Sequence, residues 1–134
     1  MDKKSKCQLY LITPARFDLN WFSKRLNIAL DAGPVACLQL RLKNVEDDTI
    51  KLAAEALLPI CHSYRIPLIM NDRPDLAMVT GCDGVHVGQA DVSYNEARSI
   101  MGSDLTVGVT CKNSRHLAVE AAESGAEYVA FGAF

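Results

Sequence analysis

Short apolar runs alternate with longer amphipathic segments along this chain. The runs are almost continuously apolar, which is typical of strands that are buried on both faces of a parallel sheet. They occupy residues 9–12, 35–40, 67–70, 84–87, 105–109 and 128–131. The pattern therefore predicts six buried parallel strands.

The segments between these runs carry the start and stop signals of five helices. Capping side chains, a proline at a first helical position and terminal glycines mark their ends. The predicted starts are Asp18, residues 45–48, Pro74, Ser93, and Asn113 or Ser114, and the predicted ends are Gly33, Pro59, Gly81, Gly102 and Gly125. At Pro59 we expect the second helix to kink or to end, because proline cannot donate the helical hydrogen bond.

Strands that alternate with helices predict an α/β fold with a parallel sheet. Two architectures fit this order: a doubly wound open sheet, or part of a (β/α)8 TIM barrel. A complete barrel needs about 200 residues or more. Residues 1–134 are interpreted as one domain, in which six strands and five helices would make either a doubly wound sheet or an incomplete TIM barrel, and both architectures stay open at this point.

Composition narrows the class of protein. Of the 134 residues, 49% are hydrophobic and 22% charged, with a net charge of -2, which indicates a globular domain and argues against nucleic-acid binding. No apolar run approaches the roughly 20 residues that span a bilayer. The five cysteines include no C-x-x-C pair and are interpreted as reduced thiols, which favours a cytoplasmic protein.

Polar side chains follow the predicted strands. They are Gln39, Arg41 and Lys43 after the second, Asn71 and Asp72 after the third, Gln89 and Asp91 after the fourth, and Thr110 after the fifth. The carboxyl ends of parallel strands share one rim, so these residues should converge there. Two carboxylates suit Mg²⁺, and two cations suit a phosphate. The residues alone predict a Mg-dependent enzyme that acts on a diphosphate.

Each of these residues also has a plainer interpretation. Asp72 could cap the next helix, whereas Asp91 is not needed as a cap because Ser93 supplies one. Arg41 and Lys43 could be solvated loop cations. Among the histidines, we expect His86 to be a satisfied core residue, and His62 and His116 to lie on the surface without acidic partners at catalytic spacing.

Five stretches together resemble the thiamine-phosphate synthase family. They are LYLIT from Leu9, QLRLK from Gln39, NDRPDLA from Asn71, DGVHVGQAD from Asp83 and GAEYVAFG from Gly125. The resemblance implies a TIM barrel that joins hydroxymethylpyrimidine diphosphate to thiazole phosphate, with release of pyrophosphate, by a dissociative mechanism. It implies Mg²⁺ ligands at Asp72 and Asp91. It also implies that Gln39, Arg41, Lys43, Asn71 and Thr110 bind the pyrimidine diphosphate, with Arg41, Lys43 and Asn71 acting in catalysis.

The chain departs from the family pattern at several positions. Thr110 replaces a serine but keeps the hydroxyl, Leu42 replaces an acid, and Thr13-Pro14 replaces Thr-Asp. The family's Pro-Thr-Lys loop for thiazole phosphate would follow Phe134. We therefore expect these 134 residues alone to be inactive and prone to associate. The sequence leaves open whether the protein forms a homo-oligomer.

Two rival hypotheses remain. A thiazole tautomerase-like barrel would not need both carboxylates, because it has no diphosphate to neutralise. A non-catalytic receiver-like module would carry an acidic pair after its first strand, where this chain has Thr13-Pro14.

Overall fold

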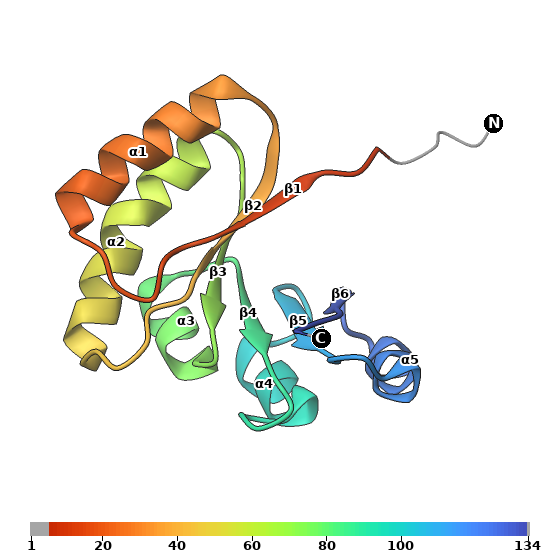
Figure 1. Cartoon of the computed structure of the whole chain (residues 1–134). Helices are drawn as coiled ribbons and strands as arrows, with labels where there is room; N and C mark the ends of the chain where they lie inside the picture. Colours follow the sequence, from red (N-terminus) through yellow and green to blue (C-terminus); the bar gives the residue numbers. More distant parts are fainter. Residues whose placement is uncertain (1–5, 134) are drawn as a thin grey trace.

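The computed structural model describes residues 6–133, in which strands and helices alternate (Figure 1). The strands are β1 (Leu9–Ile12), β2 (Val35–Leu40), β3 (Leu68–Asn71), β4 (Gly84–Val87), β5 (Thr106–Thr110) and β6 (Tyr128–Ala130). The helices are α1 (Leu19–Ala32), α2 (Asp47–Ser63), α3 (Pro74–Thr80), α4 (Tyr94–Met101) and α5 (Arg115–Ser124). All six predicted strands are confirmed, each within one residue at either end.

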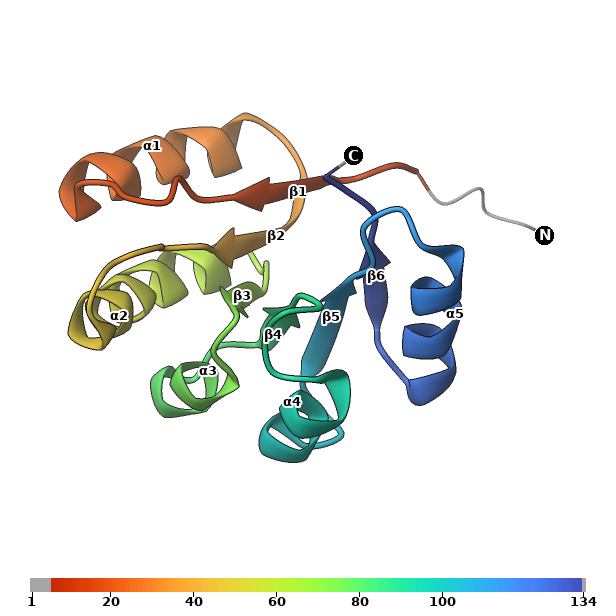
Figure 2. The same ribbon diagram turned by 60° about the horizontal axis from the view of Figure 1, so that its bottom comes forward.

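The six strands form one parallel sheet in sequential order, β1-β2-β3-β4-β5-β6. A doubly wound sheet reverses its strand order at a switch point, and this sheet does not. Figure 2 shows the strands in an arc with the helices around its outer side. The molecule is therefore a half-barrel, as the TIM-barrel interpretation predicts, and the receiver-like alternative is wrong.

Local capping explains where the helices begin. The side chain of Asp18 accepts a hydrogen bond from the Trp21 backbone N–H at 2.8 Å, and Ser93 accepts one from Glu96 N–H at 3.2 Å. Of the two candidates for the last helix, Ser114 is the cap, accepting from Leu117 N–H at 3.1 Å. These caps satisfy backbone donors that have no partner within the helix.

The prediction that α2 could end near Pro59 is wrong, because the helix continues to Ser63. Proline removes one helical hydrogen bond, but tertiary packing can outweigh that loss. On α2, Leu57 and Cys61 lie on either side of the proline and are both fully buried. Because Leu57 and Cys61 are buried on both sides of Pro59, packing against the core keeps α2 helical past the proline.

The apolar core lies between the helices and the outer face of the sheet. Leu40, Leu57, Met70, Val85 and Val107 are each at most 1% exposed in this layer. Burial of such side chains contributes about 1.5–3 kcal/mol each relative to leaving them exposed. The core fixes the helices and so leaves the inner face and the rim of the sheet to polar side chains.

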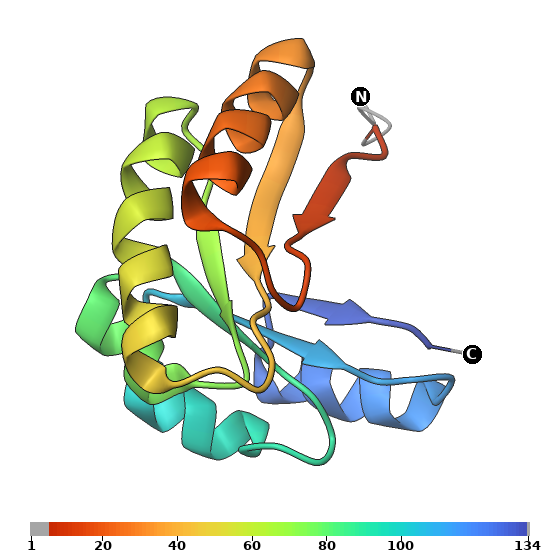
Figure 3. The same ribbon diagram turned by 60° about the vertical axis from the view of Figure 1, so that its left-hand side comes forward.

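The first and last strands form the margins of the sheet (Figure 3). Each of these strands pairs with one neighbour, β1 with β2 and β6 with β5. Apolar side chains at these margins are solvent-exposed: Leu9 by 62%, Ile12 by 55% and Phe131 by 56%. The margins are the positions at which a closed barrel would have further strands.

Candidate active site

A cavity of about 840 Å³ lies at the carboxyl ends of the strands, on the inner face of the half-barrel. All eight rim residues predicted from the sequence line it: Gln39, Arg41, Lys43, Asn71, Asp72, Gln89, Asp91 and Thr110. They come from the ends of β2, β3 and β5 and from the loop after β4. The topology thus brings together residues up to 71 positions apart in the sequence, from Gln39 to Thr110.

The two cations of the rim are positioned by the loop that follows β1. Thr13 is buried, and its hydroxyl accepts a hydrogen bond from the Arg41 backbone N–H at 2.9 Å. The Lys43 backbone N–H donates to the Ala15 carbonyl at 3.0 Å. These bonds hold the start of the β2–α2 loop against the β1–α1 loop, and Leu42 between the cations packs against the core instead.

Two carboxyl groups meet opposite Lys43. The Lys43 ammonium donates to Asp72 Oδ2 at 2.5 Å, and the carboxyl group of Asp91 lies close enough to that of Asp72 for the two to interact. Burial raises the pKa of Asp91, and the neighbouring Asp72 charge raises it further. Burial also acts to raise the pKa of Asp72, but the hydrogen bond from Lys43, the interaction with Asp91 and the charges of Lys43 and Arg41 together outweigh it and hold that pKa below its usual value. Two neighbouring carboxylates repel each other when both are ionised, so a cation bound between them would stabilise the ionised form of the pair.

Asp72 does not cap α3, so the plainer interpretation of this residue is wrong. The cap position belongs to Arg73, which makes no side-chain capping bond. By contrast, Ser93 caps α4 as expected, which leaves Asp91 to accept a hydrogen bond from the Gly88 backbone N–H at 3.1 Å. Both carboxylates are thus available to the cavity.

A chain of hydrogen bonds crosses the inner face of the half-barrel. Gln39 Nε2 donates to the Tyr10 hydroxyl at 2.9 Å, and that hydroxyl lies 2.6 Å from the Tyr128 hydroxyl. The Tyr128 oxygen lies 2.8 Å from His86 Nδ1, and His86 Nε2 lies 2.6 Å from Thr110 Oγ1. The chain links five strands and joins the two margins of the sheet.

Only the first donor of this chain is fixed, because the Gln39 amide donates to Tyr10. In the direction that continues from it, the Tyr10 hydroxyl donates to Tyr128, and Tyr128 donates to His86 Nδ1. The protonated Nε2 then donates to Thr110, whose own hydroxyl hydrogen stays free for a ligand. Burial lowers the pKa of His86, which keeps the imidazole neutral in this arrangement.

Gly108 permits the position of Tyr128 in this chain. A Cβ at residue 108 would lie only 2.0 Å from the Tyr128 ring, so only glycine allows the ring to lie over β5. The ring also stacks on His86, with centroids 5.6 Å apart. Sequence reasoning missed Tyr10 and Tyr128, because it considered the residues after the strands; the alternation of side chains along each strand could have indicated both.

The histidine predictions are largely confirmed. His86 is 7% exposed, and both of its ring nitrogens have partners, although it also lines the cavity. His62 and His116 lie on the surface as predicted, but the prediction that they lack acidic partners is wrong, because each has one. His62 lies 2.8 Å from Asp83, and His116 lies 3.0 Å from Glu120.

Within residues 6–133, no group of three or more His, Cys, Asp or Glu side chains could hold a metal ion. The carboxyl pair of Asp72 and Asp91 nevertheless suits Mg²⁺, which is commonly bound through one or two carboxylates plus substrate phosphates. The five cysteines are free, as expected. None of the helices in the described part is long and apolar enough to cross a membrane.

The fold and the rim together define a class of protein: a β/α-barrel protein whose strand ends present paired carboxylates beside cations. Comparisons with known proteins identify the family. The thiamine monophosphate synthase family model matches residues 9–134. The chain belongs to this family.

Similar proteins agree with this assignment. The thiamine-phosphate synthase of Rhodospirillum centenum is 59% identical over 128 residues, which are 96% of this chain and 62% of that protein. The thiamine-phosphate synthase of Erythrobacter litoralis is 46% identical over 130 residues, covering 95% of this chain and 60% of that protein. The chain thus spans about three fifths of these relatives.

The fold is also that of solved structures. A thiamine phosphate pyrophosphorylase from Pyrococcus furiosus matches with a TM-score of 0.81 and 26% identity, over 94% of this chain and 60% of that one. A thiamine phosphate pyrophosphorylase from Bacteroides thetaiotaomicron, 16% identical, shares the fold with a TM-score of 0.68 over 96% of this chain and 59% of that one.

Proposed function

We propose that this chain carries the diphosphate half of a thiamine-phosphate synthase. In the proposed reaction, hydroxymethylpyrimidine diphosphate and thiazole phosphate give thiamine phosphate and pyrophosphate. One observation carries the proposal: Lys43 and the carboxyl pair of Asp72 and Asp91 meet in one cavity at the strand ends. Membership of the family and the names of the relatives support it.

The carboxyl pair would hold Mg²⁺. Asp72 and Asp91 provide only hard oxygen donors, and burial with mutual repulsion raises the pKa of Asp91 in the absence of a cation. When bound, Mg²⁺ would neutralise charge on the diphosphate oxygens. The donor set and its electrostatics therefore fit this ion.

The cations of the rim would stabilise the leaving group. In a dissociative reaction the bond between the pyrimidine methylene carbon and the diphosphate oxygen breaks, and its electron pair leaves with the diphosphate. Arg41 and Lys43 line the cavity where they would stabilise that negative charge, and Asn71 would donate its amide hydrogens beside them. The thiazole nitrogen then forms the new C–N bond to the pyrimidine methylene carbon.

The inner face would orient the pyrimidine. Gln39 is 3% exposed, and its amide is fixed by Tyr10, while Thr110 is fixed by His86. A side chain already held in one rotamer loses little entropy when it binds a ligand. We propose that Gln39 and Thr110 contact the pyrimidine end of the substrate, and Arg41, Lys43 and Asn71 its diphosphate.

The paired carboxylates favour the synthase over the tautomerase-like alternative. A tautomerase has no leaving diphosphate, so a second carboxylate beside Asp72 would add repulsion without a function. The raised pKa of Asp91 shows that burial and the neighbouring Asp72 disfavour its ionised form. A divalent cation bound by both carboxylates would offset this cost, which favours the metal-dependent synthase over the tautomerase.

The remaining parts of the proposal concern the setting of the protein. We propose a single TIM-barrel domain that includes residues 1–134. We also propose a cytoplasmic enzyme with small-molecule substrates and neither nucleic acid nor membrane as a partner. The net charge of -2 and the free cysteines support this.

The test is thiamine phosphate formation by the protein expressed from the reading frame that contains this chain. Asp72→Ala and Asp91→Ala should each remove most Mg-dependent turnover while leaving the fold intact. Asp31→Ala, on the exposed face of α1, is the control and should behave as wild type. A variant of Asp72 or Asp91 that keeps wild-type Mg²⁺ dependence would refute the metal assignment of that residue.

A further inference from the structure

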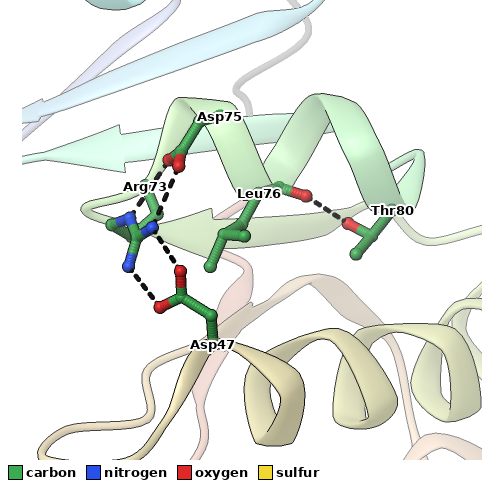
Figure 4. Close-up of polar contacts among 5 residues, drawn as sticks. All are labelled: Asp47, Arg73, Asp75, Leu76 and Thr80. Atoms are coloured by element: carbon green, nitrogen blue, oxygen red, sulfur yellow. Dashed lines mark hydrogen bonds and ion pairs between the residues drawn. The ribbon is translucent and has the colours of Figure 1, made fainter.

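Arg73 directly follows Asn71 and Asp72 in the chain but is not among the cavity-lining residues. Its guanidinium lies between two acids (Figure 4). It donates to both oxygens of Asp47, at 2.8 and 2.9 Å, and to both oxygens of Asp75, at 3.1 and 2.9 Å. The hydrogen bonds from Arg73 lower the pKa of both Asp47 and Asp75, so the cluster is fully ionised.

The backbone beside Arg73 is held in a rare conformation. The Arg73 N–H donates to the Asn71 carbonyl at 2.8 Å, which closes a three-residue γ-turn centred on Asp72. Asp72 has a φ of +64°, in the left-handed region that side chains other than glycine seldom adopt. Such a conformation costs free energy and persists only where neighbouring contacts hold it.

Contacts on both sides of the turn hold it. Before the turn, the Asp72 N–H donates to the His86 carbonyl at 2.8 Å, which continues the pairing of β3 with β4. After the turn, Pro74 is buried at the first position of α3. Arg73 adds a third contact, because Asp47 is the first residue of α2. The paired Arg73–Asp47 hydrogen bonds thus tie the turn to a different helix.

We propose that the ion pair of Arg73 with Asp47 positions Asp72 for cation binding. The pair fixes the γ-turn from outside the cavity and so directs the Asp72 carboxyl group towards Asp91 and Lys43. Arg73 and Asp47 are positioning residues, since neither would touch the cation. This inference rests on the proposed function, in which Asp72 and Asp91 hold a divalent cation.

The exposure of this ion pair separates positioning from stability. The Asp47 side chain is 52% exposed and that of Arg73 is 37% exposed. Exposed pairs contribute little to folding stability, whereas groups that orient metal ligands commonly change metal affinity by 10–100-fold. Loss of the pair should therefore appear in cation affinity and hardly at all in thermal unfolding.

The experiment measures Mn²⁺ binding, by electron paramagnetic resonance, to the protein expressed from the reading frame that contains this chain. Asp47→Asn is the test variant, and Asp48→Asn is the matched control, because it makes the same charge change one residue along α2 and Asp48 forms no ion pair among residues 6–133. We expect Asp47→Asn to raise the Mn²⁺ dissociation constant about tenfold. Asp48→Asn should change it less than about twofold, since the remaining long-range charge effect is screened by salt.

Two further variants separate the outcomes. Asp72→Asn should abolish tight binding, and Arg73→Lys should give an intermediate constant, because an ammonium can replace only part of the guanidinium fork. If Asp72→Asn weakens binding but Asp47→Asn matches Asp48→Asn, the positioning inference is wrong and the proposed function stands. If wild type does not bind Mn²⁺, or Asp72→Asn binds as well as wild type, the metal site itself is refuted. A lower unfolding temperature for Asp47→Asn with an unchanged dissociation constant would assign the pair a purely structural role and overturn the inference.

Discussion

Tyr128→Phe tests the hydrogen-bond chain that joins the margins of the half-barrel. The substitution removes one oxygen atom, which lies 2.6 Å from the Tyr10 hydroxyl and 2.8 Å from His86 Nδ1. It leaves the ring in place against His86 and over Gly108. Any loss of stability therefore reports the two hydrogen bonds and not the packing.

The magnitude follows from the groups that lose their partners. A buried polar group left without a hydrogen bond costs about 1–3 kcal/mol. Tyr128→Phe leaves His86 Nδ1 without a partner and removes one of the two hydrogen bonds of the Tyr10 hydroxyl, which keeps its bond from Gln39; both groups border the cavity. We therefore take the lower end of the range for each and expect a loss of about 2 kcal/mol in the free energy of unfolding.

The assay is unfolding in urea. The unfolding free energies of two variants can be compared only if their dependence on urea concentration has the same slope. Tyr64→Phe is the matched control, because its hydroxyl makes one exposed hydrogen bond, 3.4 Å from the Asn27 carbonyl. It should cost less than about 0.5 kcal/mol. The Tyr10→Phe/Tyr128→Phe double variant should show a coupling of about 1 kcal/mol. If Tyr128→Phe costs no more than Tyr64→Phe, the chain of hydrogen bonds does not contribute as described.

Two further predictions concern pH and the margins of the sheet. Burial holds the pKa of His86 below its unfolded value of about 6.5, so the unfolded state binds more protons and the stabilising effect of neutral His86 is lost as pH falls through that value. Unfolding at a series of pH values should show the stability advantage of wild type over His86→Gln shrinking below about pH 6.5; a constant difference would contradict the neutral imidazole. A polypeptide of these 134 residues alone should associate through the margins β1 and β6, where Leu9, Ile12 and Phe131 are exposed, and should not form thiamine phosphate. Light scattering and a synthase assay check this, and an active monomer would refute it.

The sequence predicted the strands well, because each apolar run had to be buried on both faces and had a helix signal on either side. It failed at Pro59, where the local cost of proline is visible in the sequence but the burial of Leu57 and Cys61 is not. The choice between a barrel and a doubly wound sheet depended on strand order, which hydrophobic periodicity does not encode; the family resemblance favoured the barrel.

The residues of the candidate site could be predicted because parallel strands bring their carboxyl ends together at one rim, and the polar residues follow those ends in the sequence. The closeness of Asp72 to Asp91 could not be derived from spacing, because it depends on the γ-turn at Asp72 and on the Gly88 N–H that holds Asp91. Tyr10 and Tyr128 lie inside strands and meet only because the sheet curves. Contacts of this kind depend on curvature and backbone conformation, which residue types alone do not specify.

The paired carboxylates are the central claim, and metal location in a crystal tests it most directly. The protein expressed from the reading frame that contains this chain would be crystallised with Mn²⁺, whose anomalous scattering marks its position. The account predicts one strong peak in contact with carboxylate oxygens of both Asp72 and Asp91, on the side of the cavity that Lys43 borders. A peak elsewhere, with Asp72 still paired to Lys43 and Asp91 free of metal, would contradict it.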